Sequence, residues 1–345
     1  MNVVDIHTHF LPRNWPDLTA RFGTPNWPWM KHTSAGRAML MVGDKEFRPV
    51  TAACWDADVR LEAMDRDGVD VQIMCATPVL FSYQRPAAQA LEVSRIFNDA
   101  ARELCARAPQ RLKSLCQVPL QDPELACREL SRAMADGHVG VHIGNHVGER
   151  DLHDEGIITF LQHCAAEGAA VFVHPWDMMA GERMRKYQLP WLVAMPAETQ
   201  LSILWLILSG AFERLPRSLK LCFAHGGGSF PYLLGRVDNA WRNRDLVRED
   251  CPRLPSSYVD RFYVDAAVFS GDALSFLVKT MGEERVMLGS DFPFPLGEQQ
   301  VGNLIRSHES LPARTRECLL HANATRFFGL ERTPAASAHA TRLSA

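Results

Sequence analysis

The stretches VGVHI, residues 139–143, and AVFV, residues 170–173, set the pattern of this chain. Both are short runs of β-branched and other apolar residues, and a segment with helical periodicity over 155–167 separates them. Two strands joined through a helix pair in parallel, with a right-handed crossover between them. This part of the sequence therefore predicts one strand–helix–strand unit.

The same alternation continues toward both ends of the chain. Short apolar runs predict eight strands, at 3–6, 69–75, 112–118, 139–143, 170–173, 219–223, 262–267 and 286–288. Helical periods follow them at 57–67, 87–108, 123–136, 155–167, 192–213, 230–247, 271–281 and 298–329. Eight such units predict an α/β fold of the TIM-like type, a closed (β/α)8 barrel. A doubly wound open sheet is the structural alternative.

Two segments fall outside this alternation. Residues 11–56, between the first strand and its helix, are rich in Pro, Trp and Gly. Because so long a loop is seldom structureless in a compact domain, we expect a small insertion over the barrel mouth, within one barrel domain that spans residues 1–330. Residues 331–345 are rich in Ala, Ser and Thr without an apolar period, and we expect them to be a disordered tail.

The charge and the composition argue against several classes of protein. The 345 residues carry 37 Lys+Arg and 40 Asp+Glu, a formal net charge of −3, so we expect no nucleic-acid or membrane partner. No run reaches the ~18–20 consecutive apolar residues of a membrane span, the nearest being 203–212. The N-terminal residues lack the pattern of a signal peptide. Nine scattered cysteines without a CxxC pair predict reduced thiols in the cytoplasm.

Metal-binding side chains stand at the ends of four predicted strands. The first strand continues into His7-Thr8-His9, whose histidines share one face because side chains alternate along a strand. His174 follows the fifth strand, His225 the sixth and Asp291 the eighth. Active sites of such barrels form at the carboxyl ends of the strands, so we expect these five side chains to meet there.

Each of these residues alone has a simpler interpretation. A histidine after a strand is most often a hydrogen-bonded structural residue, and Asp291 could cap a helix. Their coincidence at strand ends favours one shared metal site, held by His7, His9, His174 and Asp291, with a further position for water. Zinc is the expected ion, although imidazole and carboxylate ligands also suit Mn, Fe and Co.

His225 has a different expected role. A bound divalent cation lowers the pKa of a water ligand toward ~7, and an imidazole with an ordinary pKa near ~6.5 suits the transfer of its proton. We therefore predict that His225 acts as general acid–base on the metal-bound hydroxide, and that Asp291 is catalytic as well as a ligand. A fifth ligand or a satisfied core histidine is the alternative for His225.

Longer strings of the sequence resemble a known family. They are FRPV (47–50), MDRDGVDVQ (64–72), CATPV (75–79), QVPLQD (117–122), IGNH (143–146), VHPWDMM (173–179), LPWLVAMPAETQ (189–200), AHGGGSFPYLLGRVDNAW (224–241) and VMLGSDFPFPLGEQ (286–299). Together with the metal residues they resemble the amidohydrolase superfamily, in its mononuclear, metal-dependent decarboxylase branch. The fourth strand lacks the lysine or glutamate that bridges two metals in dinuclear relatives, which implies one metal per subunit.

The resemblance implies a role for each residue of the metal constellation. His7, His9, His174 and Asp291 match zinc ligands of the family. His225 matches the histidine that deprotonates the metal-bound water. The implied activity is that of a carboxy-lyase, a zinc-dependent, non-oxidative decarboxylase that needs no redox cofactor.

The resemblance also implies four substrate-binding positions. Arg48 matches an arginine that binds a substrate carboxylate, and Arg236 matches one that reaches the neighbouring active site of a homodimer. Trp191 and Phe294 match aromatic residues of the pocket. Two guanidinium groups suit a small dicarboxylate substrate. From the residues alone, both arginines could be surface residues and both aromatic residues could belong to the core.

Other activities remain open at this point. A metal-dependent hydrolase of a lactone or cyclic amide would use the same site, because an activated water also attacks carbonyl carbons. A decarboxylase of a related aromatic carboxylate is a second alternative. A non-catalytic barrel used for binding is a third.

Overall fold

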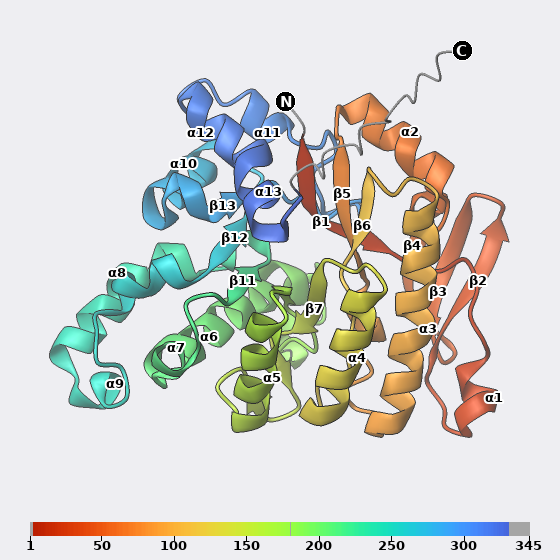
Figure 1. The fold of residues 1–345 in the computed structure, drawn as a ribbon, viewed down its shortest axis with the longest axis horizontal. Coiled ribbons are helices and arrows are strands. Elements are labelled where there is room, and N and C mark those ends of the chain that lie inside the picture. The colour runs from red at the N-terminus through yellow and green to blue at the C-terminus, as the bar shows by residue number, and fades with distance from the viewer. Residues whose placement is uncertain (1–2, 180, 331–345) are drawn as a thin grey trace, which may run out of the picture.

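The computed structural model describes residues 3–179 and 181–330, whose arrangement Figure 1 shows. Eight strands form where the sequence predicts them, and all their pairings are parallel. They are β1 (Val4–Phe10), β5 (Val71–Ala76), β6 (Leu112–Ser114), β7 (Gly140–Gly144), β10 (Ala170–His174), β11 (Lys220–Phe223), β12 (Tyr263–Asp265) and β13 (Val286–Met287). The prediction of an α/β fold with parallel strands is confirmed.

The eight strands are divided between two sheets. One sheet has the order β1–β5–β6, and the other has the order β13–β12–β11–β10–β7. Isolated parallel bridges join their edges, from Cys116 to Val141 at one seam and from Thr8 to Phe292 at the other. The described residues form no continuous eight-stranded ladder, because β6 and β13 have only three and two residues. The strands of the predicted barrel are thus present as two sheets joined at both edges.

Helices follow the strands and cover the outer faces of the sheets (Figure 1). The longer ones are α2 (Ala57–Asp67), α3 (Ala87–Ala106), α4 (Pro123–Ala135), α5 (Glu155–Ala166), α6 (Met195–Leu208), α8 (Phe230–Asn243) and α10 (Gly271–Met281). An aspartate caps the N-terminus of three of them. Asp56 accepts a hydrogen bond from the Asp58 N–H at 3.0 Å, and Asp122 and Asp154 do the same for α4 and α5. These side chains accept hydrogen bonds from backbone N–H groups of the first helical turn, which have no partner within the helix.

Three of the predicted helical periods are broken in the structure. The period over 298–329 holds α11 (Asn303–Arg306), α12 (Ala313–Glu317), the π-helix η8 (Cys318–Ala322) and α13 (Asn323–Phe328). Gly302, at φ 80°, directly precedes α11 and Pro312 directly precedes α12, and each residue disfavours a continuous helix through its position. Likewise α7 (Ala211–Arg214) follows α6 after a break at Gly210, and α9 (Asp245–Arg248) follows α8.

The insertion over residues 11–56 contains a small antiparallel sheet. Its strands are β2 (Pro28–Ser34), β3 (Arg37–Val42) and β4 (Lys45–Thr51), in the order β2–β3–β4, accompanied by α1 (Leu18–Phe22) and the short 3-10 helix η1 (Ala52–Cys54). Figure 1 places this sheet beside α3. Trp27 and Leu40 are buried and belong to the main hydrophobic core, so the insertion is packed onto the domain. The predicted tail, residues 331–345, lies outside the described residues.

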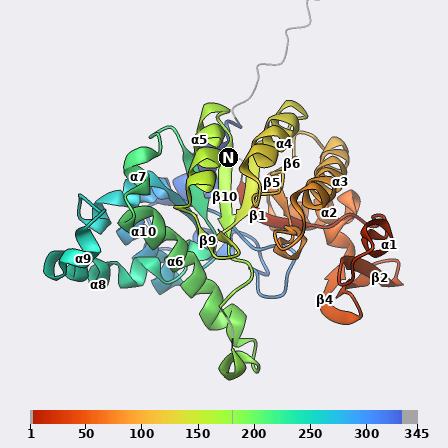
Figure 2. The ribbon, with the colours of Figure 1, turned by 90° about the horizontal axis from the view of Figure 1, so that it is seen from below.

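The segment before α6 projects from the body of the molecule (Figure 2). It includes the π-helix η4 (Pro190–Ala194), and the exposed side chains of Tyr187 and Leu192 lie on it. Among the described residues one helix, Pro190–Leu208, is long enough and apolar enough, with a mean hydropathy of 1.4, to cross a membrane by composition alone. Counting consecutive apolar residues did not identify this helix, because polar residues interrupt its apolar run. Core helices of soluble proteins also have this composition, and 39% of this one is buried. All nine cysteines are free.

Candidate metal centre

A β-bulge in β1 brings two histidines into the interior of the strand assembly. Asp5 pairs with Gln72 but Thr8 pairs with Met74, so β1 holds one extra residue between these pairs. The His7 ring contacts the Phe172 ring of β10, with centroids 4.9 Å apart, and both residues are fully buried. Bulges are common beside active sites, where they redirect side chains.

Four side chains from three parts of the fold gather at this end of the strands. His7 and His9 come from β1, His174 from the end of β10, and Asp291 from the segment after β13. One potential ligand atom of each lies within 4.8 Å of the others. His9 Nε2 lies 3.0 Å from Asp291 Oδ1 and 3.2 Å from His7 Nε2. The structure therefore brings together the four residues that the sequence assigns to the metal.

The hydrogen bonds of the histidines leave nitrogen lone pairs facing one point. His7 Nδ1 lies 2.7 Å from Asp265 Oδ2, and His174 Nδ1 lies 2.8 Å from the Pro175 carbonyl oxygen. Each Nδ1 atom therefore donates a hydrogen bond, which leaves Nε2 of each ring as the atom that can face a cation. His174 Nε2 is buried without a hydrogen-bond partner among the described residues. Lone pairs that converge in a buried site beside a carboxylate fit a divalent cation.

Asp265 is a functional residue that the sequence analysis missed. Besides its contact with His7, it accepts hydrogen bonds at Oδ1 from the Gly226 N–H at 2.8 Å and the Ala267 N–H at 3.1 Å. The carboxylate thus fixes the ring of one ligand and the backbone beside His225. Carboxylates of this kind orient metal-binding histidines and raise their basicity. Its position at the end of β12 was the sequence signal that could have identified it.

Burial and charge set the protonation of the cluster. Burial lowers the pKa of His9 to about 4, and burial together with the neighbouring imidazoles lowers that of His174 well below its usual range. Burial alone would raise the pKa of Asp291, but the hydrogen bond from His9 and the charge of His7 outweigh it and hold this pKa below its usual range. Near neutral pH, His9 and His174 are therefore neutral and Asp291 is ionised, which are the forms that bind metal.

His225 and Asp291 form the solvent-accessible side of the cluster. Each side chain is 14% exposed, whereas His7 is 0% and His9 1% exposed, and His225 Nε2 lies 4.0 Å from Asp291 Oδ2. Both backbones are left-handed, at φ 55° and 62°, a conformation that is uncommon outside glycine and concentrated at functional sites. Burial lowers the pKa of His225, and the charge of His7 lowers it further.

Arg48 and Phe294 lie beside the cluster. The Phe294 ring is 5.1 Å from the His9 ring, and the Arg48 guanidinium lies 4.2 Å from the centre of the Phe294 ring. Burial lowers the pKa of Arg48 while the charge of Asp291 opposes this change, so the guanidinium lies within electrostatic range of the metal ligands. The described residues offer Arg48 no carboxylate within ion-pair distance, which leaves its donors available.

The other two predicted substrate residues lie on peripheral elements. Trp191 is half-buried in the π-helix η4, which is part of the projecting segment. Arg236 is exposed on α8, and it is not part of the metal cluster within one chain. One chain therefore assembles the metal ligands, His225, Arg48 and Phe294, and leaves Arg236 outside.

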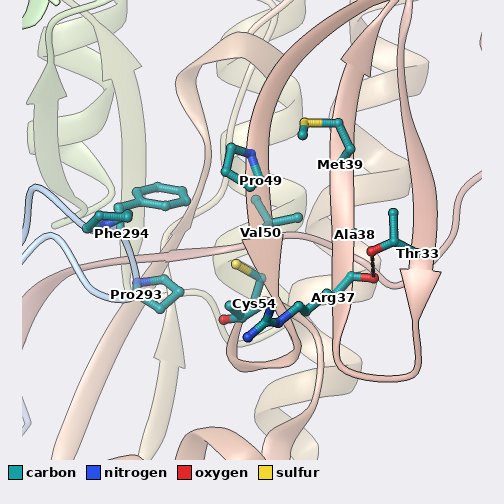
Figure 3. Close-up of a pocket in the computed structure, with 11 residues that line it drawn as sticks. Thr33, Arg37, Ala38, Met39, Pro49, Val50, Cys54, Pro293 and Phe294 are labelled. Atoms are coloured by element: carbon teal, nitrogen blue, oxygen red, sulfur yellow. Dashed lines mark hydrogen bonds between the residues drawn. The ribbon is translucent and has the colours of Figure 1, made fainter.

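An apolar cavity of about 300 Å³ lies next to this site (Figure 3). The insertion sheet forms one wall, including Met39 and Val50, and Pro293 and Phe294 form the other. No metal ligand lines the cavity, and Phe294 is shared with the surroundings of the cluster. The insertion thus packs directly against the segment that carries Asp291.

Parallel strands with three histidines and an aspartate gathered at their carboxyl ends are typical of a metal-dependent α/β enzyme. The chain belongs to the amidohydrolase family, whose sequence model matches residues 4–330. This result, like the parallel fold, agrees with the family resemblance of the motif strings.

Individual relatives narrow the enzyme class. A 2-amino-3-carboxymuconate-6-semialdehyde decarboxylase of Dictyostelium discoideum is 42% identical over 330 residues, which cover 95% of this chain and 92% of the relative. A Caenorhabditis elegans protein of the same name is 32% identical, and the match covers 95% of this chain and 94% of that protein. The motif strings predict similarity to this same decarboxylase, and both relatives confirm it. The chain is a carboxy-lyase, as the sequence predicts.

A solved structure has the same fold and a different named substrate. It is described as a dihydroxybenzoic acid decarboxylase from a Polaromonas species with bound manganese and the inhibitor 2-nitroresorcinol. Its TM-score is 0.76 at 25% identity, and the match covers 96% of this chain and 98% of that one. A divalent metal is therefore present in a decarboxylase of this fold.

Proposed function

We propose that this chain catalyses the metal-dependent, non-oxidative decarboxylation of 2-amino-3-carboxymuconate 6-semialdehyde to 2-aminomuconate 6-semialdehyde, a step of tryptophan and 3-hydroxyanthranilate breakdown in the kynurenine pathway. The observation that carries the proposal is the group of His7, His9, His174 and Asp291, with His225 on its accessible side. The names of the relatives at 42% and 32% identity support the substrate.

The architecture and the location are part of the proposal. The two joined sheets act as one (β/α)8 barrel, and residues 11–56 form the insertion beside its mouth. This barrel, residues 1–330, works in the cytoplasm, where its free cysteines stay reduced.

One zinc ion per subunit is the proposed cofactor, held by the three imidazoles and the Asp291 carboxylate. When bound, such a cation acts as a Lewis acid that lowers the pKa of a water ligand and stabilises negative charge. Asp265 keeps the His7 ring oriented, and burial keeps His9 in its neutral form. The donor set also suits manganese, the metal of the Polaromonas structure.

The substrate needs a proton and a water before its carboxylate can leave. The departing carboxylate sits on a vinylic carbon, and direct loss of CO₂ would leave an electron pair with no conjugation. Water adds across that double bond, with hydroxyl to the amine-bearing carbon and a proton to the carboxylate-bearing carbon. The C–CO₂ electrons then pass to the conjugated aldehyde as CO₂ leaves. Their return expels the added hydroxyl, which takes one proton from solvent and leaves as water, and the double bond is restored. His225 takes the proton of the water at Nε2 and returns it to carbon.

Arg48 and Arg236 are the proposed carboxylate-binding groups, and Phe294 and Trp191 are the proposed aromatic walls. Arg48 lies beside the cluster in its own chain, with a guanidinium geometry that suits two-point binding of a carboxylate. We propose that Arg236 enters the neighbouring site of a homodimer. The exposed apolar side chains of Leu192, on the projecting segment, and Tyr232, on α8, support such an interface.

Turnover of freshly generated substrate by purified, metal-quantified protein tests this function. We expect loss of the absorbance of the muconate semialdehyde with stoichiometric release of CO₂. Decarboxylation of 2,6-dihydroxybenzoate in its place would favour the aromatic carboxylate, the alternative that the Polaromonas relative supports. Acid release from lactones without CO₂ would contradict the proposal and favour the hydrolase.

A further inference from the structure

Arg60, on α2, is an arginine buried behind the metal centre. It is 0% exposed, and its hydrogen bonds within the described residues all go to uncharged oxygen atoms. Arginine is rarely fully buried, and a buried guanidinium is costly unless its donors are used. The mechanism proposed above assigns no role to this residue.

The hydrogen bonds of Arg60 meet the part of β1 that carries the metal ligands. Its Nη2 donates to the carbonyl oxygen of His9, a ligand, and its Nη1 donates to Thr8 Oγ1 at 3.3 Å. These two residues directly follow the β-bulge, where the regular pairing of β1 with β5 is interrupted. The guanidinium therefore holds the backbone at the point where the bulge redirects His9.

The remaining contacts of Arg60 tie this backbone to the elements around it. Nη1 also donates to Gln72 Oε1 of β5 at 2.8 Å, and Nε donates to the Ala53 carbonyl oxygen of η1 at 3.1 Å. The guanidinium carbon lies 5.2 Å from the centre of the Phe292 ring. Phe292 directly follows Asp291, so one planar group contacts a ligand residue and the neighbour of a second.

We propose that Arg60 is a positioning residue for the metal centre, whose planar guanidinium presets the backbone that carries His9 and Asp291 for cation binding. The rigid arrangement of its five donors suits this task, and the single ammonium of a lysine cannot reproduce it. The inference rests on the metal site of the proposed function and adds a residue that shapes that site from outside the ligand set.

Arg261 provides a matched control for simple loss of a buried arginine. It is 9% exposed and donates to the carbonyl oxygens of Phe212 and Leu215. Its guanidinium carbon also lies 5.2 Å from an aromatic ring, that of Phe212. These contacts belong to α7 and its C-terminal end, and they include no metal ligand.

The test compares Arg60→Lys with Arg261→Lys in the full-length protein. The measurements are the Kd for Zn²⁺ by chelator competition, the visible absorption spectrum of the Co²⁺-loaded protein and the Tm. We expect Arg60→Lys to raise the Kd about 10- to 100-fold, the range found when outer partners of metal ligands are lost, and to shift the Co²⁺ bands. Arg261→Lys should lower the Tm while the Kd stays within about twofold and the Co²⁺ bands stay unchanged.

Two results would overturn the inference: an unchanged Kd and Co²⁺ spectrum in Arg60→Lys, or an equal loss of affinity in Arg261→Lys. Gln72→Met removes one acceptor of the guanidinium at similar volume, and it serves if Arg60→Lys does not fold. We expect a few-fold higher Kd for it, and an unchanged Kd would again contradict the role. Failure of the wild-type protein to bind any divalent cation would instead contradict the proposed function itself.

Discussion

Two regions of the site differ in how completely one chain builds them. The inner region, around His7, His9 and His174, comes from strands, is at most 4% exposed and has its ring orientations fixed by hydrogen bonds. The proposed outer region comes from inserted or peripheral elements, with Arg48 half-buried on β4 and Arg236 exposed on α8. Within one chain the inner ligands are assembled and the outer arginines are not brought together.

We interpret this difference as a division of roles, in which the inner region provides reactivity and the proposed outer region provides substrate specificity. Strand ends in a packed core hold side chains rigidly, which metal binding requires. Loops and insertions can vary without disturbing that core, so they suit substrate recognition. Inner substitutions should therefore remove metal and activity together, whereas outer substitutions should remove activity and leave the metal bound.

The largest effect is expected for His174→Ala. Loss of one of three imidazoles should bring the metal content close to zero and activity below detection, because the remaining ligands no longer enclose the cation. Metal analysis and the decarboxylase assay measure both quantities. His163→Ala is the control, since His163 lies on α5 and contacts Ser131, and it should change neither. Full metal content in His174→Ala would break the distinction between the regions.

His225→Gln should lower kcat by about 10²- to 10⁴-fold, the usual contribution of a general acid–base, with the metal retained. In the wild-type protein, burial and the charge of His7 lower the pKa of His225 from 6.5. A base is lost when it is protonated, so kcat/KM should fall only as the pH drops below 6.5, and should be level from 7 to 8. A variant with near-normal turnover would remove His225 from the mechanism.

Arg48→Met tests the outer region. We expect kcat/KM to fall about 10- to 100-fold, mainly through KM, because a hydrogen bond to a charged group contributes about 1.5–3 kcal/mol. Metal content should stay unchanged. Arg37→Met, on the neighbouring strand of the same small sheet, is the control and should keep wild-type kinetics. Loss of metal in Arg48→Met would place this arginine with the inner region.

Asp265→Asn should have the smallest effect on turnover at saturating metal and a clear effect on affinity. The amide can no longer accept the His7 Nδ1–H as a carboxylate does, and we expect a 10- to 100-fold higher metal Kd, as in other sites where this partner is changed. Chelator competition measures the Kd. Asp238→Asn is the control. Asp238 is a buried aspartate on α8 that accepts a hydrogen bond from the Ser256 N–H, and its substitution should leave the metal Kd unchanged.

The sequence predicted the inner region better than its surroundings. Hydrophobic periodicity predicted all eight strands. Because His7, His9, His174 and Asp291 stand at strand ends in the sequence, they were expected to meet at the carboxyl ends of the strands. Both predictions depend only on residues that are close in sequence. The bulge in β1 and the contact of Asp265 with His7 depend on pairings between distant segments, which a single sequence does not encode locally. The helix breaks at Gly302 and Pro312 carried a local signal, and the apolar period masked it.

The residues of the outer region could be predicted only from the resemblance to the family. Nothing in the local sequence of Arg48 separates it from an exposed strand residue, and its place over Phe294 results from packing between the insertion and the segment after β13. The proposed role of Arg236 requires a second chain, so the pattern of its own helix could not have predicted it. Residues fixed by backbone periodicity are thus predictable here, and residues fixed by contacts between elements are not.

We propose that His7, His9, His174 and Asp291 together hold one divalent cation. Anomalous diffraction from crystals of the purified protein, collected at the absorption edge of zinc and repeated after zinc is added, tests it most directly. We expect one peak per chain, bounded by the three imidazoles and the Asp291 carboxylate. No peak after addition of zinc, or a peak held by other side chains, would contradict it.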